Sequence, residues 1–228
     1  MTPNVIRGLM GLVLAVAVIA GWSGAASAGG AGNSFEVTVT NLTRGQIISP
    51  AVVVSHSAGL SPLFTLGTAA SDELAMVAED AASGQLVNML TADPEVMAVD
   101  TIFGAGGPIM PGESASVVLD ASGRFRHFSV VGMLVTTNDA FFALNGVPGP
   151  QRGAEIHYSP AYDAGSESNN EDCDFIPGPP CENGGVRDTA GAEGYVHIHA
   201  GIHGIGDLIP AVHDWHNPVA KITIRRLN

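Results

Sequence analysis

Short segments in which apolar and polar side chains alternate limit what this chain can fold into. Residues 35–40 (FEVTVT) and 220–226 (AKITIRR) both alternate in this way, which is typical of strands that bury one face. Segments 114–119 and 127–135 are also rich in residues that favour strands. The chain has 29 glycines, 14 prolines and only 14% charged residues, a composition that favours a turn-rich β protein over a helical bundle. We therefore predict an all-β fold, an antiparallel sandwich with one polar face per sheet.

Two short helices and one long loop are expected to interrupt the strands. Segment 71–82 (SDELAMVAEDAA) begins with a serine that can cap a helix, followed by acidic residues and by apolar residues at helical spacing. A second helical turn is predicted over 85–90, and both helices should lie over a sheet or cap one end. Residues 161–192 are poor in apolar side chains and rich in Gly, Pro, Asn and acidic residues, which predicts a long acidic loop.

The first 28 residues have the features of a signal peptide. Arg7 precedes the apolar stretch 9–20, and residues 26–28 (ASA) offer an Ala-x-Ala cleavage site. The apolar stretch is shorter than the ~20 residues that a membrane-spanning helix needs. We predict a signal peptide over 1–28 and one domain over 29–228, exported to the periplasm or the extracellular space, with no membrane span after signal removal.

Cys173 and Cys181 are the only two cysteines. In an exported chain they predict a disulfide, which would close a short loop around a Pro-Gly-Pro-Pro stretch. The chain-entropy model assigns such a loop about 2–3 kcal/mol. Zinc binding by this pair is the weaker interpretation, because structural zinc sites use closer spacing and a second pair of ligands.

Charge and motifs argue against several classes of function. The formal net charge of −13 repels nucleic acid, so we predict no nucleic-acid partner. The sequence contains no Gly-x-Ser-x-Gly, no His-Glu-x-x-His and no phosphate-binding glycine loop before a helix. We therefore expect a binding domain rather than an enzyme.

Two acidic segments could share one cation. Segments 136–145 (TTNDAFFALN) and 158–167 (YSPAYDAGSE) contain Asp139, Asp163 and Glu167. Calcium prefers several oxygen ligands from carboxylates and carbonyls on irregular loops. These three residues are therefore candidate calcium ligands, and a solvated acidic loop is the alternative interpretation.

The same segments carry a family resemblance. The pattern ML-x-TTNDAFFAL, then AYDAGSES, and a closing DWHNPVAKITI resembles the spondin N-terminal domain in its bacterial stand-alone form, over roughly residues 34–226. The resemblance implies a C2-like β-sandwich that binds calcium at one end, through the positions of Asp139, Asp163 and Glu167. Ala140 stands where animal members usually have Trp, and Glu167 replaces a common Asp. The resemblance also implies a structural or adhesive role toward an extracellular or surface ligand, whose identity it leaves open.

Five of the eight histidines gather in 195–203 (YVHIHAGIH) and 212–216 (VHDWH). On a strand, His197 and His199 would project from one face, while Val196 and Ile198 would point to the core. Imidazole suits transition metals, although histidines of this kind can also simply hydrogen-bond loops. The alternative function is therefore a periplasmic or extracellular protein that binds copper or zinc through this cluster: His197, His199, His203, His213 and His216.

Overall fold

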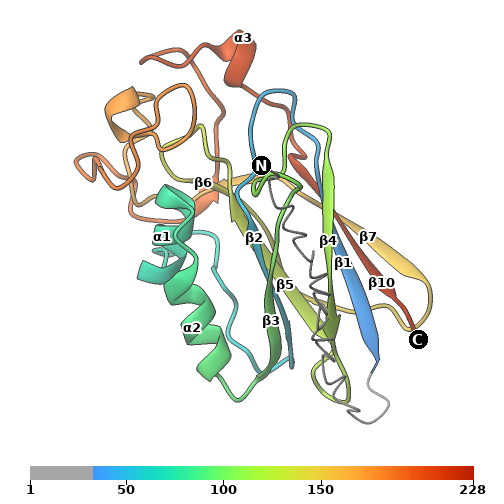
Figure 1. Cartoon of the computed structure of the whole chain (residues 1–228). Coiled ribbons are helices and arrows are strands. Elements are labelled where there is room, and N and C mark those ends of the chain that lie inside the picture. Colours follow the sequence, from blue (N-terminus) through green and yellow to red (C-terminus); the bar gives the residue numbers. More distant parts are fainter. Residues whose placement is uncertain (1–32) are drawn as a thin grey trace, which may run out of the picture. The chain divides into compact units, whose positions relative to one another are not determined.

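Two antiparallel β-sheets pack face to face in this protein (Figure 1). The computed structural model describes residues 33–228, so the predicted signal peptide, 1–28, lies outside the described residues. One sheet has the strand order β4-β1-β10-β7 and the other the order β3-β2-β5-β6-β8-β9, which confirms the predicted all-β sandwich. The strands are β1 Ser34–Asn41, β2 Ala51–His56, β3 Val96–Ile102, β4 Ser114–Asp120, β5 His127–Met133, β6 Ala140–Pro148, β7 Ala154–Ser159, β8 Ala161–Asp163, β9 His197–Ile198 and β10 Ala220–Arg226.

The four-stranded sheet has the single polar face that the sequence predicts. Alternate residues of β1 are buried, so that Val37 and Val39 lie in the core while Thr38 lies on the outer face. β1 pairs with β10 so that Val37 lies opposite Ile224, and both side chains enter the space between the sheets. The alternation of the sequence therefore corresponds directly to burial in this sheet.

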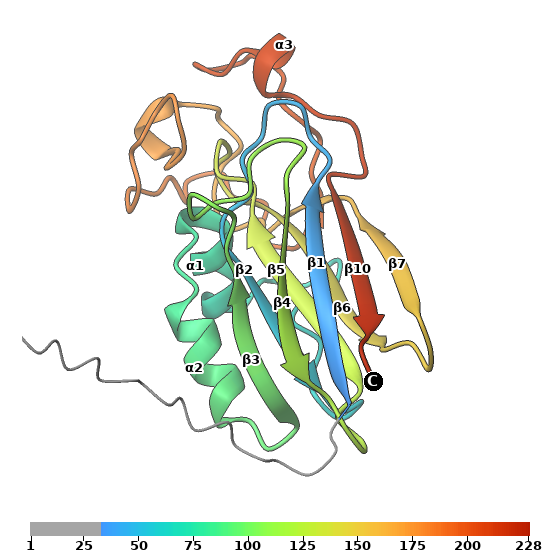
Figure 2. The same ribbon diagram turned by 45° about the vertical axis from the view of Figure 1, so that its right-hand side comes forward.

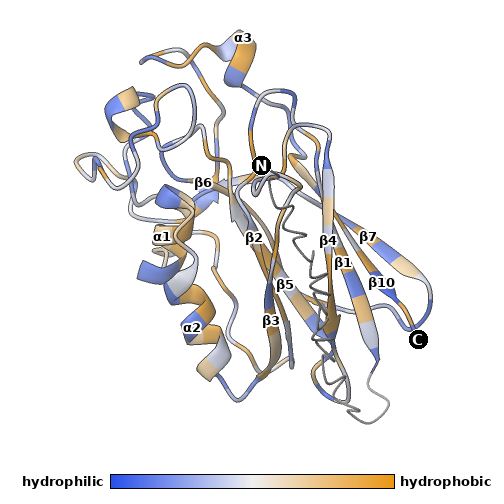
Figure 3. Ribbon diagram, viewed as in Figure 1, coloured by the Kyte–Doolittle hydropathy of each residue, from blue (hydrophilic) through white to orange (hydrophobic). Residues whose placement is uncertain are grey.

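The six-stranded sheet is apolar on both faces, which differs from the prediction. In β2, Val53 packs between the two sheets, whereas Val52 and Val54 pack with residues of α1 (Asp72–Asp80) and α2 (Gly84–Ala92). Figure 2 shows these two helices lying over the outer face of the sheet, and Figure 3 shows apolar colouring along its strands. Because a layer covers each face, the central strands have no solvent-facing side and lose their polar alternation.

α1 begins where the sequence predicts. The Ser71 hydroxyl accepts a hydrogen bond from the Leu74 N–H (3.3 Å), as an N-cap residue does. The helix ends at Ala81, which adopts the left-handed conformation (φ 55°). Glu79 and Asp80 therefore lie in the last turn, where the helix dipole disfavours negative charge.

The long loop contains two short regular pieces, β8 and a 3-10 helix over Cys173–Phe175. The predicted disulfide between Cys173 and Cys181 is confirmed. Because disulfides persist in oxidising compartments, it indicates an exported environment. A third helix, α3 (Pro210–His213), follows near the C-terminus. Among the described helices, none has the length and apolar character needed to cross a membrane.

Candidate cation centre

The register of three neighbouring strands sets the position of the site. Ala140, the first residue of β6, lies opposite Asp163 at the end of β8, and Asp163 lies opposite His197 at the start of β9. Opposed residues on antiparallel strands have Cβ atoms about 4.5–5.5 Å apart. Asp139 directly precedes β6, and its carbonyl accepts a hydrogen bond from the Ala164 N–H (3.2 Å). Residues far apart in the sequence therefore meet at one end of the six-stranded sheet.

Asp139 is completely buried, with an exposed fraction of 0%. Its Oδ2 accepts hydrogen bonds from the backbone N–H groups of Ser166 (2.8 Å) and Glu167 (3.1 Å). Its Oδ1 is also buried but has no hydrogen-bond partner among residues 33–228. Burial, and then the negative charge of Asp163, raise the pKa of Asp139 to about 7. Among residues 33–228, no cationic side chain forms an ion pair with the Asp139 carboxylate.

Asp163 and Glu167 lie in the same buried region. Asp163 accepts a hydrogen bond at Oδ1 from the Gly165 N–H (2.7 Å), and burial is the main cause that raises its pKa. Burial, followed by the charges of Glu79 and Asp139, raises the pKa of Glu167 to about 8. Asp139 is therefore close enough to Asp163 and to Glu167 for the charges of these predicted calcium ligands to influence ionisation.

Sequence reasoning misses a fourth buried acid, Glu79 of α1. Its side chain is 5% exposed, and burial is the main cause that raises its pKa. Arg187 of the long loop places Nε 2.5 Å from Glu79 Oε2 and Nη2 2.7 Å from Asp80 Oδ2. In the described part of the chain, no other arginine or lysine forms an ion pair with these acids. The signal that could have found Glu79 is an acidic residue in the last turn of a helix, a position that the helix dipole disfavours.

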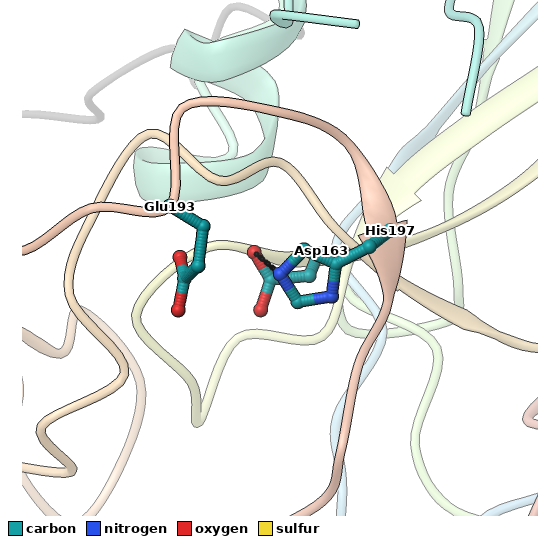
Figure 4. A group of neighbouring side chains, drawn as sticks. All are labelled: Asp163, Glu193 and His197. Carbon is teal, nitrogen blue, oxygen red and sulfur yellow. Dashed lines mark ion pairs between the residues drawn. The ribbon is translucent and has the colours of Figure 1, made fainter. Parts of the chain in front are cut away.

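Three side chains with metal-ligating atoms converge beside this region (Figure 4). Within residues 33–228, Asp163, Glu193 and His197 form the one group whose ligand atoms all lie within 4.8 Å of one another. His197 Nδ1 lies 3.0 Å from the carbonyl oxygen of Ile198, to which it donates. Its buried Nε2 lies 3.5 Å from Asp163 Oδ1 and has no hydrogen-bond partner among the described residues. Glu193, on the loop before β9, is a second residue that the sequence did not reveal.

The structure brings only some of the five predicted histidines together: burial, and then the charges of His197 and His203, lower the pKa of His199 to about 4. His199 Nε2 lies 3.8 Å from Asp163 Oδ2, but its Nδ1 accepts a backbone N–H (2.9 Å). The proton of the neutral ring is therefore on Nε2, which leaves that atom no lone pair for a metal. His213 Nδ1 also accepts a backbone N–H (3.0 Å), while His203 and His216 are exposed.

The short length of β9 explains part of the difference between the predicted and observed positions of the histidines. Val196 is buried as predicted, but Ile198, which we expected to face the core, is 47% exposed. β9 has only two residues and is the edge strand of its sheet, and the chain then turns at Gly201, where φ is 95°. Alternation over so short a strand cannot place His203 beside His197.

Gly165 allows the turn after Asp163 to lie against the segment that precedes β9. Its φ is +65°, and a Cβ atom there would lie 2.3 Å from the carbonyl oxygen of Tyr195. We expect Gly165→Ala to destabilise the protein by about 3 kcal/mol, from backbone strain together with this clash. Gly153 has a similar φ of +67° with nothing within 4 Å, so Gly153→Ala should cost only about 1 kcal/mol. Urea unfolding of both variants measures the difference, and equal losses would show that the close approach to Tyr195 is not needed.

No model of a known protein family matches this chain, and no curated protein matches it. The resemblance to the spondin N-terminal domain therefore stays a prediction. Function has to be argued from the chemistry of the site, since a sandwich architecture by itself does not imply one.

Proposed function

We propose that this chain is an exported β-sandwich domain that binds calcium through Asp139, Asp163 and Glu167. The bound ion would hold the loops at one end of the six-stranded sheet, and the domain would serve a structural or adhesive role toward a ligand at the cell surface or outside the cell. The observation that carries the proposal is the buried Oδ1 of Asp139, which has no hydrogen-bond partner among the described residues and lies in a region of excess negative charge.

The charge balance of the region supports a bound cation. Arg187 supplies one positive charge, at Glu79. Buried carboxylates are strongly unfavourable unless they are paired, coordinate a metal or stay protonated. A divalent ion would supply the positive charge that the other acids lack. Five acidic residues among the described residues are at most 5% exposed: Glu79, Asp139, Asp163, Glu167 and Glu171. The Glu171 carboxylate is already satisfied by three backbone N–H groups, which leaves the other four to be balanced.

Calcium fits this donor set better than other common ions. It takes 6–8 oxygen ligands at about 2.3–2.6 Å in adaptable geometry, whereas magnesium requires a near-ideal octahedron and keeps more of its water. Asp163 ends strand β8, and Glu167 lies on the irregular loop that follows, which can adjust its carboxylates and carbonyls around the ion. The resemblance to the spondin N-terminal domain implies the same three ligands, and the adhesive role rests on that resemblance.

Calcium titration of the chelator-treated protein by calorimetry tests the proposal. We expect one calcium ion per chain, and we expect Asp163→Ala to weaken the affinity by more than about 100-fold, beyond the loss that follows removal of an outer-sphere partner. Asp174→Ala is the matched control, because Asp174 is an exposed acid on the same loop. Unchanged calcium affinity in Asp163→Ala would refute the site, and an equal loss in Asp174→Ala would mean that calcium responds only to surface charge.

A further inference from the structure

We infer that Asp163, Glu193 and His197 form a second metal site, which binds a divalent transition ion such as zinc beside the proposed calcium site. This inference does not depend on calcium binding, although Asp163 belongs to both proposed sites and its carboxylate would bridge the two ions when both are bound. It rests on the convergence of these three side chains (Figure 4) and on the hydrogen bonds that orient them.

His197 is oriented as metal-binding histidines are. Such residues commonly donate one ring N–H to a carbonyl or carboxylate, which fixes the tautomer and leaves the other nitrogen free to bind the metal. His197 donates from Nδ1 to the Ile198 carbonyl (3.0 Å), so in the neutral ring its Nε2 carries a lone pair. That Nε2 is buried and without a hydrogen-bond partner in the described part of the chain. The ring of Tyr195 packs against the imidazole, with ring centroids 5.3 Å apart.

Asp163 does not form a hydrogen bond with His197 Nε2. Its Oδ1 already accepts the Gly165 N–H and its Oδ2 accepts the Asn169 amide. The 3.5 Å separation of His197 Nε2 and Asp163 Oδ1 is longer than a good hydrogen bond. It is close to the spacing of about 3.4 Å between two ligands of a tetrahedral zinc ion with bonds of about 2.0–2.2 Å.

Asn169 holds the two carboxylates toward each other. Its Nδ2 donates to Asp163 Oδ2 (2.6 Å) and to Glu193 Oε1 (3.2 Å). The adjacent Gly194 N–H donates to the Gly165 carbonyl (2.8 Å), which ties the loop of Glu193 to the turn after Asp163. Outer-sphere contacts of this kind position metal ligands before the ion arrives.

The donor atoms select the class of ion. One imidazole nitrogen and two carboxylate oxygens suit zinc and neighbouring divalent ions, while the lack of sulfur in this set disfavours copper(I). Glu193 is exposed, so water can reach a fourth coordination position. Three protein ligands with one open position are the arrangement of zinc sites that bind water or a substrate.

Zinc titration of the calcium-saturated full chain, produced without a histidine tag, tests this inference. We expect one zinc ion per chain, and cobalt(II) in its place should give the visible absorption of a low-coordinate site. His197→Ala and Glu193→Gln should each weaken zinc affinity by at least about 10–100-fold. His216→Ala should leave it unchanged, because His216 is exposed and outside the group.

Calcium affinity separates this site from the proposed calcium site. His197→Ala should leave calcium affinity unchanged, because calcium prefers oxygen ligands. Absence of zinc binding, wild-type zinc affinity in His197→Ala, or an equal loss in His216→Ala would each overturn the inference. Zinc that binds only by displacing calcium would overturn it as well, since no separate site would then exist. Glu193→Gln is a surface change, so its result does not depend on preserving the core.

Discussion

Asp139→Asn is expected to change stability in opposite directions with and without calcium. At pH 8 in chelator, the substitution should raise the melting temperature, because it removes a buried negative charge from a region that already holds Asp163 and Glu167. The asparagine carbonyl can still accept the hydrogen bonds that Oδ2 receives from the loop. In excess calcium the same variant should melt below the wild type, because it has lost a ligand of the ion.

The wild-type protein without cation should lose stability as pH rises from about 4 to 8. The pKa of Asp139 is raised from 3.8 to about 7 and that of Glu167 from 4.5 to about 8. Below the lower values both states are protonated, so the acids cause no pH dependence there. Between the two sets of values the unfolded chain has released protons that the folded protein still holds, so the free energy of unfolding falls with pH. Calcium should remove much of this fall, since its charge replaces the protons.

Differential scanning calorimetry between pH 5 and 8 measures both effects. In chelator we expect the wild-type melting temperature to fall by at least about 10 °C across this range, given that about 1 kcal/mol shifts it by 2–4 °C in a domain of this size. Asp174→Asn, an exposed acid of the same loop, is the control and should follow the wild type. A melting temperature that stays level with pH in chelator, or an Asp139→Asn variant that is less stable than wild type in both conditions, would contradict the assignment.

Arg187→Gln is expected to destabilise the cation-free protein by about 2–3 kcal/mol. Arg187 pairs with Glu79, whose side chain is only 5% exposed, and loss of its partner leaves a buried carboxylate without compensation. Breaking fully buried pairs costs about 3–5 kcal/mol, and the lower figure allows for the 36% exposure of Arg187 itself. Calcium should restore part of the loss, because the ion would neutralise the neighbouring carboxylates.

Arg124→Gln provides the matched comparison. Arg124 pairs with Glu95, but the two side chains are 57% and 27% exposed, so the loss should stay below about 1 kcal/mol. Urea unfolding in chelator compares the variants, and Glu79→Gln combined with Arg187→Gln should recover most of the stability that Arg187→Gln loses. If Arg187→Gln were no more destabilising than Arg124→Gln, Arg187 would not be the counter-charge of the buried acids.

Several parts of this structure could be predicted from residues that are close in sequence. The alternation over 35–40 and 220–226 identified β1 and β10, because a strand with one solvent face repeats every two residues. Ser71 marked the start of α1, because its hydroxyl caps a neighbouring N–H. The presence of only two cysteines, in a chain that we predicted to be exported, indicated that they form a disulfide, and Cys173 and Cys181 do so. Each of these features depends on residues that are close in sequence or few in number.

Only the tertiary structure shows which residues lie together in the candidate site. Asp163 meets His197 because β8 and β9 pair in one particular register, and Glu79 enters because α1 packs on the outer face of the same sheet. No local pattern encodes these approaches, since register and helix docking are set by which apolar faces become buried. The same cause removed the polar face expected for the six-stranded sheet, and among the described residues it kept the five predicted histidines from forming one group of metal ligands. The residue types pointed to cation binding by carboxylates and imidazole, while packing between distant parts of the sequence determined which of these side chains lie together.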